Sequence, residues 1–287
     1  MPTDVIVGAL WGDEGKGKLV GAIGGGYDAV LQVNASTNAG HCVHDGTAAR
    51  VTRQLPSVFG PGRTLLVLAP GALLNLEALA DELLARHDLP TLRGRVRVAS
   101  SITLVLRPYV EKGQGGLSLT LGSTHQGTGP SAVARTARHA LRLFDVEAAW
   151  RGLAFGADRA EVLGKLERTC VETSPEHFRP GEPATAAYCA DVLEGLVLAF
   201  DRLEGALGPG WCVDYTALLR GELRGARLLI EGCNGLLLDN LHGALPHVTS
   251  ASTNVGAMLA GANLSPLGLG RGRSTQSNDR RESRPSI

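Results

Sequence analysis

Short runs of branched apolar residues alternate along the chain with stretches in which apolar residues recur at helical spacing. The runs predict strands over residues 4–10, 28–33, 64–68, 95–99 and 227–230. Asn75 is a suitable N-cap for one of the helices, which are expected over residues 18–23, 75–86, 131–143 and 184–203. This alternation predicts an α/β fold with a mostly parallel sheet flanked by helices, whose ligands bind beyond the carboxyl ends of the strands.

The last segment of the chain has a different composition. Between Arg271 and Ile287 there are five arginines, two acidic residues, four serines and almost no apolar side chains. Such a segment cannot bury enough apolar surface to offset the entropy that is lost when it is ordered. We therefore expect one nucleotide-binding domain over residues 1–266, followed by an irregular, disordered tail over residues 267–287.

The overall composition argues against several classes of protein. Because 28 basic residues balance 28 acidic ones, no net field attracts the chain to nucleic acid or anionic lipid. No apolar run approaches the ~18 residues of a membrane-spanning helix, and charges near the start oppose a signal peptide. The five scattered cysteines suggest no disulfide framework or zinc site and are interpreted as small core residues. We expect a cytoplasmic protein without nucleic-acid or membrane partners.

A glycine-rich loop joins the first predicted strand to the first predicted helix. The segment Gly12-Asp-Glu-Gly-Lys-Gly-Lys18 matches most of the phosphate-loop pattern, in which backbone N–H groups and a lysine hold phosphate oxygens. Leu19 stands where that pattern has a hydroxyl for Mg²⁺, so either no metal binds or another oxygen, most obviously that of Asp13, supplies the contact. An acid in such a loop is costly unless it binds a cation or transfers a proton. The alternative is a solvated loop of mixed charge.

Three further segments extend this signal, and the four occur in a fixed order. They are Trp11-Gly-Asp-Glu-Gly-Lys-Gly-Lys18, then Asn38-Ala-Gly-His41, then Gly122-Ser-Thr-His-Gln-Gly-Thr-Gly-Pro130 with Ala134-Arg-Thr-Ala-Arg138, then Glu231-Gly-Cys-Asn-Gly-Leu-Leu-Leu-Asp239 through Val248-Thr-Ser250. Between about residue 4 and residue 262 the chain resembles the adenylosuccinate synthetase family. The resemblance implies a phosphate-loop-NTPase-like fold and a GTP-dependent carbon–nitrogen ligase of purine biosynthesis. Such an enzyme joins IMP to L-aspartate through a 6-phosphoryl-IMP intermediate, with Mg²⁺ as cofactor.

The resemblance assigns roles to individual residues. Asp13 matches the catalytic base and a Mg²⁺ ligand, His41 matches the catalytic acid, and the carbonyl of Gly40 matches a second metal contact. The residues expected to bind GTP and phosphate are Gly12, Asp13, Glu14, Gly15, Lys16, Gly17, Lys18, Gly40, His41 and Cys42. The residues expected to bind IMP are Asp13, Glu14, Gly15, Lys16, Asn38, Ala39, Gly40, His41, Thr124, Arg138, Asn234 and Thr249.

Two of these positions need comment. Asn234 stands where the family has glutamine, so the side chain keeps its amide group but is shorter. Arg138 matches an arginine that reaches the neighbouring subunit's IMP site in the family, which implies a homodimer. The alternative for Arg138 is an exposed helix residue, and the alternative for Lys16 and Lys18 is a solvated helix start.

The sequence also departs from the family after residue 262. The arginine-rich loop that grips aspartate and the Thr-Lys-x-Asp motif that reads guanine have no counterpart, so we expect a C-terminally truncated copy with weak or no ligase activity. Three interpretations stay open: a ligase for IMP and L-aspartate, a purine-nucleotide-binding remnant without turnover, and a ligase that acts on dGMP to make a 2-aminoadenine precursor. Gln126 and Arg53-Gln-Leu-Pro56 are the hints of the third.

Overall fold

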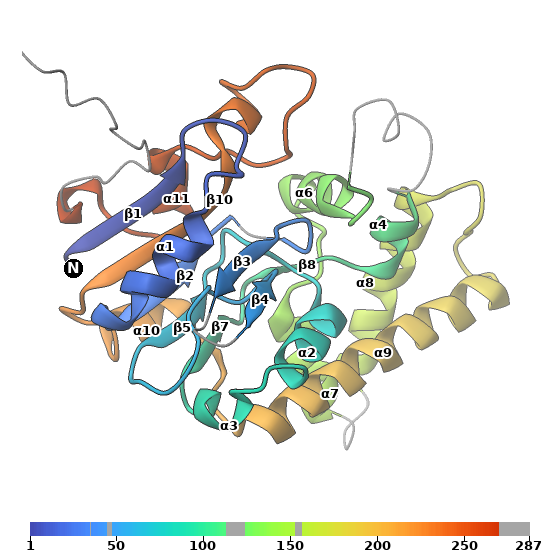
Figure 1. Cartoon of the computed structure of the whole chain (residues 1–287). Helices are drawn as coiled ribbons and strands as arrows, with labels where there is room; N and C mark the ends of the chain where they lie inside the picture. The colour runs from blue at the N-terminus through green and yellow to red at the C-terminus, as the bar shows by residue number, and fades with distance from the viewer. Residues whose placement is uncertain (35, 45–47, 113–123, 153–156, 270–287) are drawn as a thin grey trace, which may run out of the picture.

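A six-stranded parallel sheet forms the centre of the molecule (Figure 1). The computed structural model describes residues 1–34, 36–44, 48–112, 124–152 and 157–269. The sheet has the order β1-β10-β2-β5-β7-β9, and every neighbouring pair in it is parallel. Its strands span Thr3–Gly8 (β1), Ala29–Gln32 (β2), Leu65–Leu68 (β5), Val96–Ala99 (β7), Cys212–Val213 (β9) and Leu228–Gly235 (β10). The predicted α/β class with a mostly parallel sheet is confirmed.

Four shorter strands lie outside this sheet. An antiparallel pair joins His41–His44 (β3) to Ala49–Thr52 (β4), and a parallel pair joins Leu73–Leu74 (β6) to Thr103–Leu104 (β8). The sequence pattern predicted none of the four. The first pair is important for the site, because His41 is the first residue of β3.

Helices surround the sheet and also pack on one another (Figure 1). Among them, α2, α7, α8 and α9 form one group, while α1 packs on β1, β3 and β10. Asn75 caps α2 as predicted, since its side chain accepts a hydrogen bond from the Ala78 N–H at 3.0 Å. The α-helices of the described residues are Lys16–Ile23 (α1), Leu76–Leu84 (α2), Leu89–Leu92 (α3), Arg107–Lys112 (α4), Thr128–Ala137 (α6), Leu143–Arg151 (α7), Ala157–Thr173 (α8), Pro183–Leu207 (α9), Tyr215–Arg220 (α10) and Val255–Gly261 (α11).

The single helix predicted over residues 131–143 is wrong. The chain instead forms α6 and α7, because Arg138 adopts a left-handed conformation with φ 69° and ends α6. Leu141 and Leu143 are both fully buried, so the spacing of apolar residues continues although the helix is interrupted between them and α6. Tertiary packing therefore overrides the helical pattern here.

Helix α9 is long and apolar enough to cross a membrane, judged by length and composition alone. In this fold Leu193, Phe200 and Leu203 of α9 lie in the hydrophobic core, and α9 packs on α2, α7 and α8. These contacts are those of a core helix.

Two smaller expectations have mixed outcomes. Cys170, Cys189 and Cys233 are buried as predicted, but Cys42 is exposed and Cys212 is partly exposed, so the prediction of a core position is wrong for Cys42. The chain after residue 266 is described only as far as residue 269, where a 3₁₀ turn at Pro266–Gly268 leads to a bridge between Leu269 and Thr3. The rest of the predicted tail lies outside the described residues.

Candidate nucleotide site

The motifs come together at the carboxyl edge of the sheet. Strand β10 lies between β1 and β2, so the loops that leave these three strands are neighbours although they are far apart in sequence. Gly8 at the end of β1 pairs with Gly235 at the end of β10. Ligands of open parallel sheets bind at this edge, which is where the fold predicts a site.

Close backbone approach shapes the first glycine loop. Gly12 has φ 99°, and a Cβ atom on it would lie 2.9 Å from backbone atoms of Asn234. Gly15 has φ 77° and precedes α1 without any side-chain cap. Positive φ and contact of this kind favour glycine, and the uncapped first turn leaves backbone N–H groups for an anion. The loop therefore has the local structure of a phosphate loop.

Lys16 braces this loop from inside. Its side chain is buried, and its Nζ donates to the Gly12 carbonyl at 2.9 Å and lies 3.4 Å from the Glu14 carboxylate. Burial raises the pKa of Glu14, but hydrogen bonds from the Leu10 and Gly12 backbone and the charge of Lys16 outweigh burial and keep this pKa below its ordinary value. Asp13 and Lys18 are exposed, and Leu10 and Trp11 are also exposed nearby. Of the two predicted phosphate lysines, only Lys18 is on the surface.

His41 lies against the start of α1. A Cβ atom on Gly17 would be 2.8 Å from the His41 Cβ, so the glycine makes room for the histidine. The ring Nδ1 contacts the Glu231 carboxylate and lies 3.3 Å from the Ser57 hydroxyl. Burial lowers the pKa of His41, but the Cys233 thiol and the Glu231 carboxylate outweigh burial and raise this pKa to about 11. The contact with the Glu231 carboxylate therefore favours the protonated form of the imidazole.

The second motif is tied to the fourth through Cys233. The Asn34 side chain accepts from the Cys233 N–H at 2.9 Å and donates to the Cys233 carbonyl at 3.1 Å. Ala39 and Cys233 are both buried and form a small apolar cluster. Through Ala39, the Asn38-Ala-Gly-His41 segment therefore packs on Cys233, the residue before Asn234, whose backbone has φ 63°.

The N-terminus of α6 joins the same edge. The Thr37 hydroxyl donates to the Gln126 carbonyl at 3.4 Å, and the Ser36 and Thr128 hydroxyls lie 3.1 Å apart. A Cβ atom on Gly129 would lie 3.4 Å from the Ser250 hydroxyl, which brings the end of the fourth motif to α6. Two residues expected to bind IMP lie in the adjoining loops. Thr124 is exposed, and the Thr249 N–H donates to the Leu238 carbonyl at 2.9 Å. Positions 122 and 123 of the third motif lie outside the described residues.

Arg138 is not brought to this cluster within one chain. It follows the last residue of α6, is exposed, and ten residues of α-helix place it about 15 Å along the axis from the α6 N-terminus. Its position agrees with either an exposed helix end or a role toward a second subunit.

Asp239 fixes the loop that carries Thr249. Its buried carboxylate accepts hydrogen bonds from the backbone N–H groups of Leu241 at 2.9 Å, His242 at 3.1 Å and Thr253 at 2.6 Å. Burial raises the pKa of Asp239, but these bonds and one from Asn254 outweigh burial and lower this pKa to about 2. The ionised carboxylate therefore holds the backbone of the fourth motif together through these hydrogen bonds.

Replacement of Asp239 by asparagine is expected to destabilise the chain near neutral pH, because an amide cannot accept all of these bonds. We expect a loss of roughly 2 kcal/mol in the free energy of unfolding. The folded pKa lies below the ordinary value of 3.8, so this stabilisation is present above about pH 4 and is lost as the pH falls toward 2. Urea denaturation of both proteins across this range checks it, and a difference that did not shrink in acid would contradict the prediction.

The donor set for a metal at this edge is small. Among the described residues, no group of three or more His, Cys, Asp or Glu side chains is arranged to hold a metal ion. Mg²⁺ commonly binds through one or two carboxylates together with substrate phosphates, and does not need a full protein cage. The Asp13 carboxylate and the Gly40 backbone are both exposed, and the space beside the Gly40 Cα is open, so each is accessible to such an ion.

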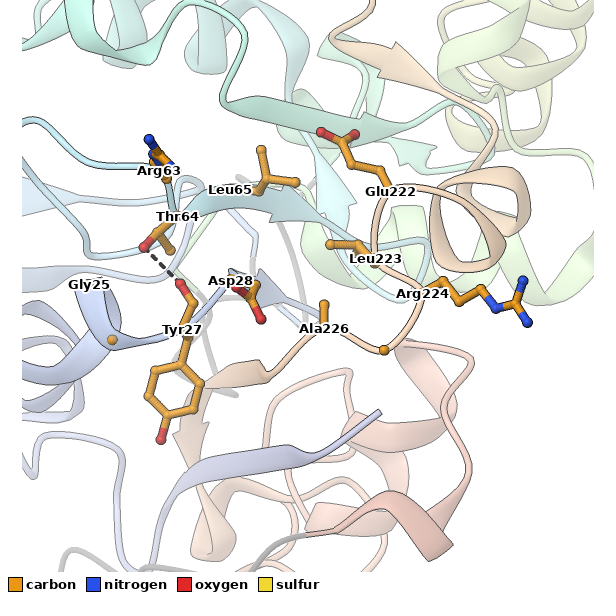
Figure 2. Close-up of a pocket in the computed structure, with 12 residues that line it drawn as sticks. Gly25, Tyr27, Asp28, Arg63, Thr64, Leu65, Glu222, Leu223, Arg224 and Ala226 are labelled. Carbon is orange, nitrogen blue, oxygen red and sulfur yellow. Dashed lines mark hydrogen bonds between the residues drawn. The ribbon is translucent and has the colours of Figure 1, made fainter.

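A hollow of about 640 Å³ lies at the opposite edge of the sheet, at the amino ends of β2, β5 and β10 (Figure 2). Thr64 lines this hollow, and its hydroxyl donates to the Tyr27 carbonyl at 2.9 Å. Its two acidic residues are already engaged: Asp28 accepts from the Arg227 N–H, and Glu222 pairs with Arg97. No motif residue lines this hollow, so the carboxyl edge is the candidate site.

The fold and this edge define the class of protein: an α/β protein with a phosphate loop at the carboxyl ends of its parallel strands. The chain belongs to the adenylosuccinate synthetase family, because the sequence profile of that family matches residues 5–271. It is 29% identical to the adenylosuccinate synthetase of Helicobacter hepaticus, over 93% of this chain and 61% of that protein. It is 30% identical to that of Schistosoma japonicum, over 93% of this chain and 59% of that protein. The chain thus spans about three fifths of the length of these relatives.

Two solved structures share the fold. The fully ligated adenylosuccinate synthetase of Plasmodium falciparum superposes with a TM-score of 0.78 at 21% identity, over 96% of this chain and 61% of that one. The succinoaminodeoxyadenylate synthetase of cyanophage S-2L, bound to dGMP and dATP, superposes with a TM-score of 0.61 at 23% identity, over 92% and 60%. The predicted fold class is confirmed by this likeness.

Proposed function

We propose that the chain carries the nucleotide-binding and phosphoryl-transfer site of an adenylosuccinate-synthetase-type ligase, which acts on IMP, GTP and L-aspartate with Mg²⁺. The observation that supports this most directly is that His41 packs on Gly17 of the phosphate-loop helix and contacts Glu231 of the fourth motif. Three of the four motifs therefore meet at one point. We also propose that the protein works as a cytoplasmic homodimer, with the exposed Arg138 directed to the partner subunit's site.

The reaction must activate an inert oxygen. The 6-oxo group of a purine is not displaced by an amine, so it is first phosphorylated. In the proposed mechanism Asp13 removes the proton from N1 of IMP, and the resulting charge on O6 attacks the γ-phosphorus of GTP as GDP leaves. The amine of aspartate then displaces phosphate from C6. Mg²⁺, when bound, neutralises charge on the phosphates during the transfer.

His41 supports the transfer as a donor. A protonated imidazole has two N–H groups, and the Glu231 carboxylate occupies the one on Nδ1. The Nε2–H is then available for the purine O6, where negative charge develops. The uncapped N-terminus of α1 and the surface lysine Lys18 would hold phosphate oxygens.

Calorimetry followed by an assay of phosphate release tests the proposal. We expect IMP and GTP to bind, and we expect any phosphate release to require IMP, GTP, L-aspartate and Mg²⁺ together. An Asp13→Ala variant serves as the control for turnover. Repeating the assay with dGMP in place of IMP tests the guanine-deoxynucleotide alternative. Failure of both purine monophosphates and of GTP to bind would overturn the proposal.

A second candidate function is purine-nucleotide binding without turnover. It is favoured by Asn234, whose side chain is one methylene shorter than the glutamine of the family pattern and whose backbone is held with φ 63° against Gly8 and Gly12. A shorter amide arm at this position would reach less far toward the substrate. Binding of IMP and GTP with no phosphate release would support this candidate over the ligase.

A further inference from the structure

A buried carboxylate lies directly behind His41. Glu231 is on β10, between β1 and β2, and its side chain has no exposure to solvent. One oxygen contacts the His41 Nδ1 and accepts from the Ser57 hydroxyl, and the other accepts from the Ser57 N–H at 2.8 Å. A fully buried acid is rare unless it is paired, and this one is paired only with His41 and Ser57 among the described residues.

Ser57 is itself held in place. The Glu82 carboxylate of α2 accepts hydrogen bonds from the backbone N–H groups of Arg53 at 3.0 Å, Gln54 at 2.9 Å and Leu55 at 3.2 Å. The Thr52 hydroxyl lies 3.1 Å from the Ser57 hydroxyl. The segment that carries Ser57 is therefore clamped to α2, and Ser57 can hold the Glu231 carboxylate in one orientation.

The consequence for the histidine is geometric. A carboxylate facing Nδ1 keeps a proton on that nitrogen and fixes the orientation of the ring. On the side of the His41 Cβ, Gly17 closes the space. With Nδ1 facing the Glu231 carboxylate, Nε2 is the other ring nitrogen and the one that the proposed function assigns to the ligand.

We propose that Glu231, supported by Ser57, is a positioning residue for His41: it holds the Nδ1–H and thereby presents the Nε2–H to the substrate oxygen. The inference rests on the proposed function, because it takes His41 as the group that faces the purine. Glu231 itself does not touch substrate in this scheme.

The test compares Glu231→Gln with wild type in two measurements. Glutamine keeps the shape of the side chain and removes its charge. The first measurement is the proton NMR signal of the His41 Nδ1–H in protein labelled with ring-¹⁵N histidine. We expect this signal far downfield, and its loss in His41→Asn assigns it. We expect it to move upfield in Glu231→Gln. In the phosphate-release assay we expect kcat to fall by about 10–100-fold, the usual cost of removing such a supporting partner, with the KM for IMP nearly unchanged.

Two further variants keep the test decisive. Ser57→Ala removes a single oxygen, so it is expected to fold, and it should shift the same proton by a smaller amount. Glu222→Gln is the matched control, because Glu222 is exposed, pairs with Arg97 and lines the hollow at the opposite edge of the sheet. It should change neither measurement.

The outcomes separate this inference from the proposed function. A proton that moves in Glu231→Gln and Ser57→Ala, in a chain that binds nucleotides without turnover, supports the hold of Glu231 on the His41 Nδ1–H and rejects the ligase. A proton that stays in place in both variants overturns the positioning role, whether or not the wild-type chain releases phosphate. An unchanged kcat in a well-folded Glu231→Gln would overturn it as well.

Discussion

Replacement of Asp13 by asparagine is expected to lower the rate of phosphate release by about 10²–10⁴-fold, the usual contribution of a general base. The amide has the shape of the carboxylate but cannot take a proton from N1 of IMP at neutral pH. Asp13 is exposed in the phosphate loop, and no side-chain bond to it occurs among the described residues, so its loss should not disturb the fold. Calorimetry should therefore show nearly unchanged binding of IMP.

A matched control distinguishes loss of the base from a general effect of removing one acid. Asp191→Asn removes an exposed carboxylate of α9 that pairs with Arg107 of α4. We expect this variant to release phosphate at the wild-type rate. Wild-type turnover in Asp13→Asn would show that another group removes the proton, and weak IMP binding in that variant would show that Asp13 acts mainly in binding.

Five of the six strands of the sheet were predicted, because they are rich in apolar residues, whereas β9 was missed because it has two residues, both only partly buried. Residues 29–31 and 65–68 form continuous apolar runs, and the predicted boundaries agree with β2 and β5 to within one residue. The helices over 75–86 and 184–203 were also predicted, since α2 and α9 have long apolar faces. The break at Arg138 was not predictable in this way, because a left-handed residue other than glycine depends on the packing around it.

The candidate site was only partly predictable. The glycine loop gave a local signal, since the pattern itself demands close backbone approach. The contact of His41 with Glu231 joins residues 190 positions apart, and it exists only because β10 is inserted between β1 and β2. One signal for Glu231 was present in the sequence: it is an acid within an otherwise apolar run, a position where a charge requires a partner. The identity of that partner required the topology.

The junction between the first and fourth motifs leads to the second large prediction, in which Gly235→Ala destabilises the site. A Cβ atom on Gly235 would lie 2.2 Å from the Leu10 carbonyl oxygen and 2.5 Å from the Gly12 nitrogen. Both are backbone atoms, so no side chain can move aside, and either β10 or the phosphate loop must shift. We expect the free energy of unfolding to fall by about 3 kcal/mol, the upper part of the range for overpacked sites. Binding of IMP and GTP should be lost with it.

Gly25→Ala provides the matched control for this substitution. Gly25 lies in the 3₁₀ turn Gly24–Gly26, and a Cβ atom on it would meet no atom within 4 Å. Its stability should stay within about 0.5 kcal/mol of wild type, as for an ordinary surface change. Chemical denaturation measures the stability of the two variants, and calorimetry measures their nucleotide binding. The comparison is between a glycine whose Cα lies against backbone atoms and one whose Cα faces open space. If Gly235→Ala retained wild-type stability and nucleotide binding, the two motifs could not be in the close contact on which the proposed site depends.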